Sequence, residues 1–393
     1  MRLCSIKDLR PGMRVARDIC DERLELLIAA GIALDLRMIE RLQDLEIEDV
    51  YIHEPGTDDI IPRDDLLSDK ARRKTHKLLK RTFDDLTSLA DMSEYANDDV
   101  ITILQYDDRF ANAVKVSHFH EVIHSTVDEL FTRHEDVFEA PVVKRYLDRK
   151  YEHSLNTAML SIMLGRAFHY PPEKLIVLGT AAMLHDVGKL IFSELAAKHN
   201  RDLTSEEQRR MRLHPAAGAA ILSRSGGNTL LEEATIRQHH EQQDGRGYPL
   251  GLMGDNLPPL ETRAPRHREI IRYAEILAVA NTFDNLINGD LIVDPMSPAK
   301  AMETLVRGAG SLYNRSVVSE ALKIINVYPV GSIIEIRVGN LMFESGARGV
   351  VRRGNHHNLH RPEILVLWDR HGRRSSPRIL DLNRYPGIEI ELV

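Results

Sequence analysis

Six residues in the middle of this 393-residue chain have side chains suited to holding metal ions. They are His153, His185, Asp186, His214, His239 and His240. A single histidine at a helix end or on an apolar helix face is most often a core residue, satisfied by one backbone carbonyl. Here, four separate segments all bring imidazoles to apolar surface. Burying each of these imidazoles would cost roughly a few kcal/mol if its ring nitrogens lacked hydrogen-bond or metal partners. A metal cluster removes that cost, so we expect these side chains to converge.

The spacing indicates more than one ion. Neighbouring residues on a helix point about 100° apart, so His185 and Asp186 would face two adjacent ions, as would His239 and His240. A carboxylate between two cations can bridge them, which makes Asp186 the expected bridge and the site at least dinuclear. Imidazole-rich ligation favours iron, manganese, cobalt or zinc over magnesium or calcium. Lys189 follows in the run HDVGK, where its ammonium group suits a phosphate oxygen.

A compact loop follows the second histidine pair in the run HHEQQDGRGYP. Glycine permits backbone angles closed to other residues and proline stiffens the chain, so the run predicts a tight loop beside the site. A simple chain-reversing turn is the alternative, and Glu241 is not needed as a ligand. The loop residues that we expect to border a substrate cleft or to meet a partner are Asp244, Gly245, Gly247, Tyr248 and Pro249.

The elements that position these residues are mostly helices. Apolar residues recur with helical spacing in the segments 109–133, 151–168, 173–186, 204–223, 229–242 and 267–288. LIVLGTAAML, just before His185, is apolar on all sides and predicts a helix in the middle of a bundle. We predict a mainly α fold: a helical bundle at 98–326, a small α/β module at 1–56, a charged, solvated helical linker at 57–97 and a β-rich module at 327–393.

Composition limits the function and the location of the protein. The formal net charge of −7 argues against a protein that wraps DNA or RNA. The two cysteines, Cys4 and Cys20, form neither a disulfide framework nor a thiolate metal site. No signal sequence is evident, and we expect no run of the roughly 20 apolar residues that span a membrane. These features favour a cytoplasmic protein, and a homodimer is compatible with them.

HDVGK followed by HHE and DGRGYP resembles the HD-GYP family, a subclass of the HD metal-dependent phosphohydrolases that hydrolyse cyclic di-GMP. The resemblance covers about residues 98–326. It implies that His153, His185, Asp186, His214, His239 and His240 are metal ligands. It also implies that Lys189 contacts the scissile phosphate and that GGDEF-type cyclases are partners. The implied product is the linear dinucleotide, and whether a second cut yields GMP stays open.

Two departures from the family pattern leave alternatives open. Arg149 stands where relatives with three metals carry a glutamate, so the resemblance implies two metals, iron or manganese before zinc, cobalt or nickel. In the run AVANTFDNL, Asn281 stands at the position of an aspartate ligand, and the later RPYR segment is absent. We expect Asn281 to be a weak amide ligand and Asp284, one turn later, to orient a ligand or to cap local backbone groups.

The alternatives to cyclic di-GMP hydrolysis are a weak or inactive cyclic-dinucleotide-binding adaptor and a phosphohydrolase for another nucleotide, such as cyclic GMP-AMP. Arg272 and the basic residues before it offer phosphate contacts in place of RPYR, although a helix start exposed to water is the preferred interpretation.

Overall fold

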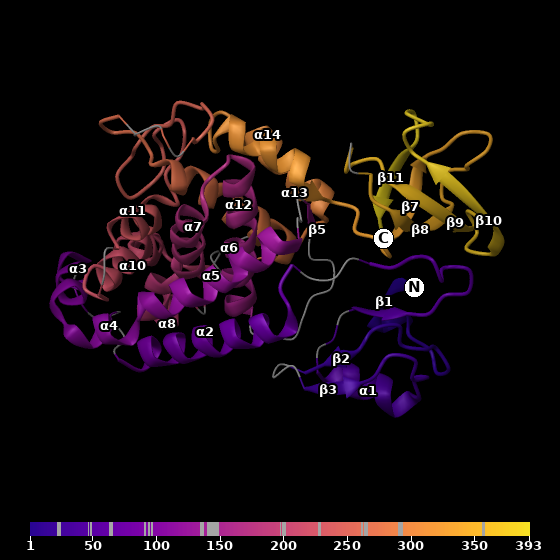
Figure 1. Ribbon diagram of the computed structural model, residues 1–393, viewed down its shortest axis with the longest axis horizontal. Helices are drawn as coiled ribbons and strands as arrows, with labels where there is room; N and C mark the ends of the chain where they lie inside the picture. The colour runs from indigo at the N-terminus through magenta and orange to yellow at the C-terminus, as the bar shows by residue number, and fades with distance from the viewer. Residues whose placement is uncertain are drawn as a thin grey trace.

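The computed structural model covers the whole chain. It describes all residues except 22–24, 46, 48, 63–65, 90, 91, 93, 94, 96, 134–136, 140–148, 197, 199–201, 227, 228, 261, 263–265, 290–293, 356 and 357. Helices occupy one side of the molecule, and two small modules that contain the strands lie at the other (Figure 1). The fold is mainly α, with a small N-terminal α/β module and a β-rich C-terminal module, as predicted.

The helical part is built around α6, α7 and α12. Its elements are α2 (Asp69–Leu89), α3 (Asn97–Tyr106), α4 (Asp108–Ala113), α5 (Val116–Arg133), α6 (Arg149–Ala167), α7 (Pro172–Leu184), the 3-10 helix η2 (Val187–Phe192), α8 (Ser193–Ala196), α9 (Ser205–Met211), α10 (His214–Leu222), α11 (Leu230–Gln238), α12 (Arg272–Asn288), α13 (Pro298–Gly308) and α14 (Arg315–Ile324). Helix α6 packs against both α7 and α12. All three are buried on most sides, because their sequences are apolar almost all round.

The N-terminal module contains β1 (Arg2–Ser5), the 3-10 helix η1 (Ile6–Asp8), β2 (Ile19–Cys20), β3 (Leu26–Ile28), α1 (Leu36–Asp44) and β4 (Asp49–Ile52). β1 pairs antiparallel with β4, and β2 with β3. Ile39 and Leu42 bury one side of α1 in a small core of this module. The module also touches the C-terminal one, since the backbone N–H of Leu3 donates to the carbonyl of Gly331.

The C-terminal module is a five-stranded antiparallel sheet in the order β10-β9-β8-β7-β11. Its strands are β7 (Ile333–Val338), β8 (Arg348–Arg353), β9 (Glu363–Trp368), β10 (Arg374–Asp381) and β11 (Glu389–Leu392). Two very short strands, β5 (Phe138–Glu139) and β6 (Ile325–Asn326), pair in parallel at the junction with the helices. The runs EILVLWD and IEIELV have the apolar pattern of strands and contain β9 and β11, whereas the sequence of β10 lacks that pattern.

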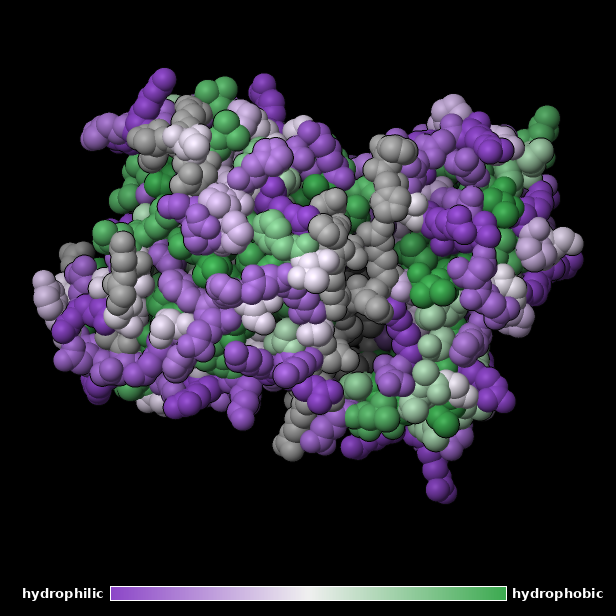
Figure 2. Space-filling model, viewed as in Figure 1, coloured by the Kyte–Doolittle hydropathy of each residue, from purple (hydrophilic) through white to green (hydrophobic). Residues whose placement is uncertain are grey.

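Helix α2 differs from the prediction of a solvated linker. Its charged residues give it a hydrophilic outer face (Figure 2), but Leu79, Phe83 and Leu86 are buried in the main core. Arg72 on the same helix is buried and bonded to Glu152 of α6 at 3.1 and 3.2 Å. The helix is therefore part of the bundle, and the domain boundary at 97/98 stays a prediction.

Among the described residues, one helical segment, Pro172–Phe192, is long and apolar enough to cross a membrane by length and composition alone. However, 72% of its most apolar window is buried inside the fold, and the core helix of a soluble protein passes the same test. The segment includes α7, which the sequence predicts as a buried helix.

Candidate metal centre and the loop beside it

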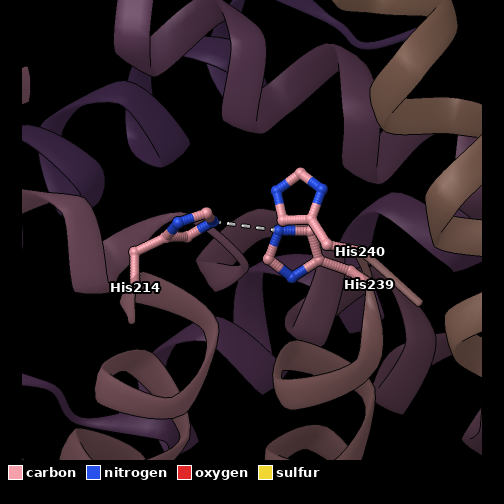
Figure 3. A group of neighbouring side chains, drawn as sticks. All are labelled: His214, His239 and His240. Atoms are coloured by element: carbon pink, nitrogen blue, oxygen red, sulfur yellow. Dashed lines mark hydrogen bonds between the residues drawn. The ribbon is translucent and has the colours of Figure 1, made fainter. Parts of the chain in front are cut away.

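The six candidate ligands come together from four helix ends. His153 lies in the first turn of α6, and His185 and Asp186 directly follow α7. His214 begins α10, while His239 and His240 follow α11 (Figure 3). Helices that end inside the core deliver polar side chains to its centre, which is the convergence that the sequence predicts.

Three of these histidines have their protonation pattern fixed by the backbone. In each of them Nδ1 lies within hydrogen-bond distance of the carbonyl oxygen three residues earlier. These contacts are His185 to Ala182 at 2.7 Å, His214 to Met211 at 2.9 Å and His239 to Ile236 at 2.6 Å. Because a carbonyl only accepts, Nδ1 carries the proton and Nε2 has a free lone pair.

The free Nε2 atoms face one another. Nε2 of His214 lies 3.3 Å from Nε2 of His239, and Nε2 of His153 lies 3.2 Å from Nε2 of His185. Two lone pairs at this distance repel unless a cation or a proton lies between them. Metal ligands in proteins commonly show this arrangement, in which the second ring nitrogen is held by a carbonyl or carboxylate.

Asp186 lies between two groups of side chains that could each hold an ion. Its Oδ2 is 3.6 Å from Nε2 of His153 and 3.5 Å from Nε2 of His185. Its Oδ1 is 3.3 Å from Nε2 of His214 and 3.8 Å from Nε2 of His239. Oδ1 is buried without a hydrogen-bond partner among the described residues.

The residues present fit divalent metal ions. His153, His185 and Asp186 offer ligand atoms within 4.8 Å of one another, and so do His214, His239 and His240. The combination of several neutral imidazoles with one carboxylate suits iron, manganese, cobalt, nickel or zinc. The orphaned oxygen of Asp186 and the facing imidazole nitrogens would all find a partner in such ions.

Electrostatics favours neutral imidazoles and a charged carboxylate in most of the site. Burial lowers the pKa of His185 to about 4, and it also lowers the pKa of His214, His239 and His240. Burial raises the pKa of Asp186, but its interactions with His185 and Lys189 outweigh burial and hold that pKa well below its usual value. Neutral imidazole and ionised carboxylate are the forms that bind metals.

His153 is the exception in its protonation. Burial lowers its pKa, but hydrogen bonds to the carboxylates of Asp186 and Asp284 outweigh burial and raise it to about 9. Nδ1 of His153 lies 2.7 Å from Oδ2 of Asp284, which is 3% exposed. Asp284 therefore contacts and orients a candidate ligand, one of the two roles expected from the sequence.

Asn281 lies one turn before Asp284 on α12, and Lys189 contacts Asp186. Asn281 is buried on α12, and its Oδ1 accepts a hydrogen bond from Nδ2 of Asn285 at 2.7 Å, so its role as a weak ligand stays a prediction. Nζ of Lys189 donates to Oδ2 of Asp186 at 2.6 Å. Its side chain is 35% exposed, which leaves it accessible to a ligand.

Arg272 corrects the expectation of an exposed helix start. It is 3% exposed and bonded to three carboxylates. Those carboxylates belong to Asp255, Glu269 and Glu275. It also precedes Asn281 by nine residues, about 13 Å along the helix axis at the usual rise. Within the described part of the chain, its ion pairs go to these carboxylates and not to the histidine cluster.

The loop after α11 packs directly on the histidines. The ring of Tyr248 stacks on His240 with centroids 4.7 Å apart, and burial raises the pKa of its hydroxyl. Gly245 has a φ of +77°, which favours glycine. At Gly247 a Cβ would lie 2.5 Å from the carbonyl oxygen of His240, so a larger residue would displace the loop.

Two acidic side chains hold the loop in place. Glu241 is buried and accepts from the backbone N–H groups of Leu250 and Leu252 at 2.6 and 2.8 Å. Oδ1 of Asp244 accepts from the N–H of Arg246 at 3.0 Å. The loop ends in the cis peptide between Tyr248 and Pro249. Glu241 therefore holds the loop, a role that sequence reasoning missed.

Sequence reasoning also missed two other side chains, one on α11 and one beside the loop. Glu232 is 1% exposed on α11, and its Oε1 lies 2.8 Å from Nε2 of His120. Arg212 lies over the ring of Tyr248, with 5.4 Å between its guanidinium carbon and the ring centre. Its place two residues before His214 was the only signal in the sequence.

Comparisons with known proteins agree with this geometry. Residues 139–317 match the HD domain family. A cyclic di-GMP phosphodiesterase of Pseudomonas aeruginosa is 25% identical over 280 residues, which are 71% of this chain and 62% of that protein. A cyclic di-GMP phosphodiesterase of Thermotoga maritima is 28% identical over 278 residues, which are 69% of this chain and 66% of that protein. The matched regions span a little under two thirds of the length of both relatives.

A solved structure also matches this chain. It belongs to an HDG"Y"P protein from Bdellovibrio bacteriovorus and covers 81% of this chain and 97% of its own. The sequence identity is 18% and the TM-score is 0.42.

Proposed function

We propose that the chain belongs to the HD domain family, in its HD-GYP subclass, and that it is a metal-dependent phosphodiesterase that hydrolyses cyclic di-GMP. Two relatives that carry this activity in their names support the substrate. The product of the reaction is the linear dinucleotide, and a second cut would yield GMP.

One observation carries the proposal: the two oxygens of Asp186 face two different groups of histidines. Oδ2 lies near His153 and His185, at 3.6 and 3.5 Å. Oδ1 lies near His214 and His239, at 3.3 and 3.8 Å. A carboxylate in this position could hold two cations at once, which is an arrangement suited to phosphodiester hydrolysis.

Each group of ligands would then hold one ion. His153, His185 and Asp186 would hold the first, and His214, His239 and His240 would hold the second. Asp186 would contribute to the second ion as well, with Asn281 as a weak further ligand. Two divalent cations, iron or manganese in preference to zinc, cobalt or nickel, would supply an activated water and offset negative charge on the phosphoryl oxygens. Arg149 at the position of the third-metal glutamate supports two ions.

The other side chains act on the substrate and on the ligands. Lys189 donates to a phosphoryl oxygen of the scissile group, where its charge stabilises the charge that develops during attack. Asp284 holds the ring of His153 through Nδ1. The loop that carries Gly245, Gly247 and Tyr248 borders the cleft and offers a surface to GGDEF-type cyclases. We propose that the protein is located in the cytoplasm, and a homodimeric state is compatible with this proposal.

Substrate profiling tests the proposed reaction. The protein, loaded separately with iron and manganese, is given cyclic di-GMP and cyclic GMP-AMP, and the products are separated by chromatography. The proposal predicts a higher kcat/KM for cyclic di-GMP, with the linear dinucleotide appearing first. A higher kcat/KM for cyclic GMP-AMP would show that cyclic GMP-AMP is the preferred substrate, while the proposed reaction class would stay the same.

A weakly active or inactive adaptor that binds the dinucleotide is the second candidate, and Asn281 favours it. An amide is neutral and binds cations less tightly than a carboxylate, and its oxygen already accepts a hydrogen bond from Asn285. Substituting Asn281→Asp and measuring bound metal and turnover distinguishes the two. Large gains in both would mean that the natural protein is the adaptor, whereas no change in metal affinity would show that Asn281 is not a ligand.

A further inference from the structure

Arg212 is an exposed side chain at the edge of the candidate metal centre that the proposed ligand set does not use. It directly follows α9 and precedes the candidate ligand His214 by two residues. Its guanidinium carbon lies 5.4 Å from the centre of the Tyr248 ring, which stacks on the candidate ligand His240 at 4.7 Å. A cation from the turn between α9 and α10 thus meets the loop beside the histidines.

The charge of Arg212 is not matched by a carboxylate within the part of the chain that the structure describes. Its neighbours differ in this respect. Lys189 is paired with Asp186 at 2.6 Å, and Arg209 on α9 is paired with Glu206. Holding an unpaired guanidinium beside a site leaves it ready to bind an anion.

The contact with Tyr248 leaves the donors of Arg212 available. A guanidinium over an aromatic ring is attracted through the ring's face, whereas its five N–H groups lie in the guanidinium plane and remain free. That planar fork matches two oxygens of a phosphodiester. Because the ring restrains the side chain, less conformational freedom is lost when the anion binds.

We propose that Arg212 binds the second phosphodiester of the substrate, the one that is not cleaved. This inference rests on the proposed function, because a cyclic dinucleotide carries two phosphodiesters and the metal centre with Lys189 takes one. Arg212 is then a specificity-determining residue that favours substrates with two phosphodiesters over substrates with one.

The experiment compares two substrates on matched variants of the full chain. Cyclic di-GMP has two phosphodiesters, whereas bis(p-nitrophenyl) phosphate has one. The variants are Arg212→Gln, which removes the charge, Arg212→Lys, which keeps the charge without the fork, and Arg209→Gln, a control on the neighbouring helix. Metal content and thermal unfolding are measured for each variant.

For Arg212→Gln we expect KM for cyclic di-GMP to rise about tenfold or more, with kcat and metal content nearly unchanged. KM for bis(p-nitrophenyl) phosphate should stay the same, Arg212→Lys should be intermediate, and Arg209→Gln should resemble the wild type. An unchanged KM for cyclic di-GMP would overturn the inference and leave the proposed reaction standing. An equal loss with both substrates, or a loss in kcat with lower metal content, would also overturn it.

Binding separates failure of the inference from failure of the proposed function. If the wild type does not hydrolyse cyclic di-GMP, its dissociation constant is measured by equilibrium dialysis. Weaker binding by Arg212→Gln than by Arg209→Gln would still support the inference. Equal binding by both variants, or no binding by the wild type, would overturn it.

Discussion

Replacing Asp284 by asparagine tests how the first metal site is held. The carboxylate accepts from two groups: Nδ1 of His153 at 2.7 Å through Oδ2, and Nδ2 of Asn288 at 2.8 Å through Oδ1. An asparagine of the same shape has only one oxygen. In Asp284→Asn one of the two donors therefore faces an NH₂ group and loses its acceptor.

Asp284→Asn changes metal affinity through two effects that depend differently on pH. Removing a carboxylate that orients a ligand histidine commonly lowers metal affinity about 10- to 100-fold. Against this, the pKa of His153 is about 9 in the metal-free protein, so metal must displace a proton at lower pH. This competition weakens wild-type binding about tenfold for each pH unit below 9. Asp284→Asn lowers that pKa and weakens the competition, so its deficit should be largest at pH 9 and shrink toward pH 7.

The assay is titration with Mn²⁺ buffered by a chelator, from pH 7 to 9. Asn288→Ala is the control, because it keeps the carboxylate on His153 and should change the affinity little. Equal affinities of Asp284→Asn and the wild type at pH 9 would refute the role given to Asp284. A deficit independent of pH would refute the part of the reasoning that depends on the proton of His153.

Three further predictions concern the packing around the centre. Gly188→Ala should destabilise the protein by about 3 kcal/mol or more, because the new Cβ would lie 2.0 Å from the carbonyl oxygen of His214; an unchanged melting temperature would contradict this contact. Glu241→Gln should weaken the loop by about 1–3 kcal/mol and speed its cleavage by proteases without changing metal content, and metal loss would instead make Glu241 a ligand. Metal-free protein should be most stable near pH 6.5, the ordinary pKa of histidine, in denaturant titrations. Below that pH, His185 binds a proton in the unfolded chain but not in the folded protein, where its pKa is about 4, so stability falls as the pH falls. Above that pH, the stability that comes from protonated His153 is lost as the pH rises through about 9. Stability that rises steadily from pH 5 to 9 would contradict that assignment.

The convergence of the histidines could be predicted because each follows or begins a helix whose apolar sequence puts its end in the core. LIVLGTAAML buries α7, and His185 therefore lies at 0% exposure. The place of Asp186 between the two groups of histidines also follows from helix geometry, since adjacent residues point in different directions. Which ions bind, and how many, stays a prediction.

Burial of charged residues could not be predicted from local patterns. Arg272 looks like an exposed helix start, yet the loop before α12 folds back and brings Asp255 to it at 3.3 Å. Arg72 and Glu152 are 80 residues apart and pair between two helices. Strand β10 was missed for a related reason: RSSPRILD contains proline and few apolar residues, and its pairing with β9 places it in the sheet.

Elemental analysis of protein purified without oxygen, alongside turnover of cyclic di-GMP, tests the central claim most directly. It is made on the wild type and on Asp186→Ala, which removes the proposed bridge. The account predicts two iron or manganese ions per wild-type chain, with turnover, and loss of both metal and turnover in Asp186→Ala. Turnover that survives in Asp186→Ala, or an active wild type with a single ion, would contradict it.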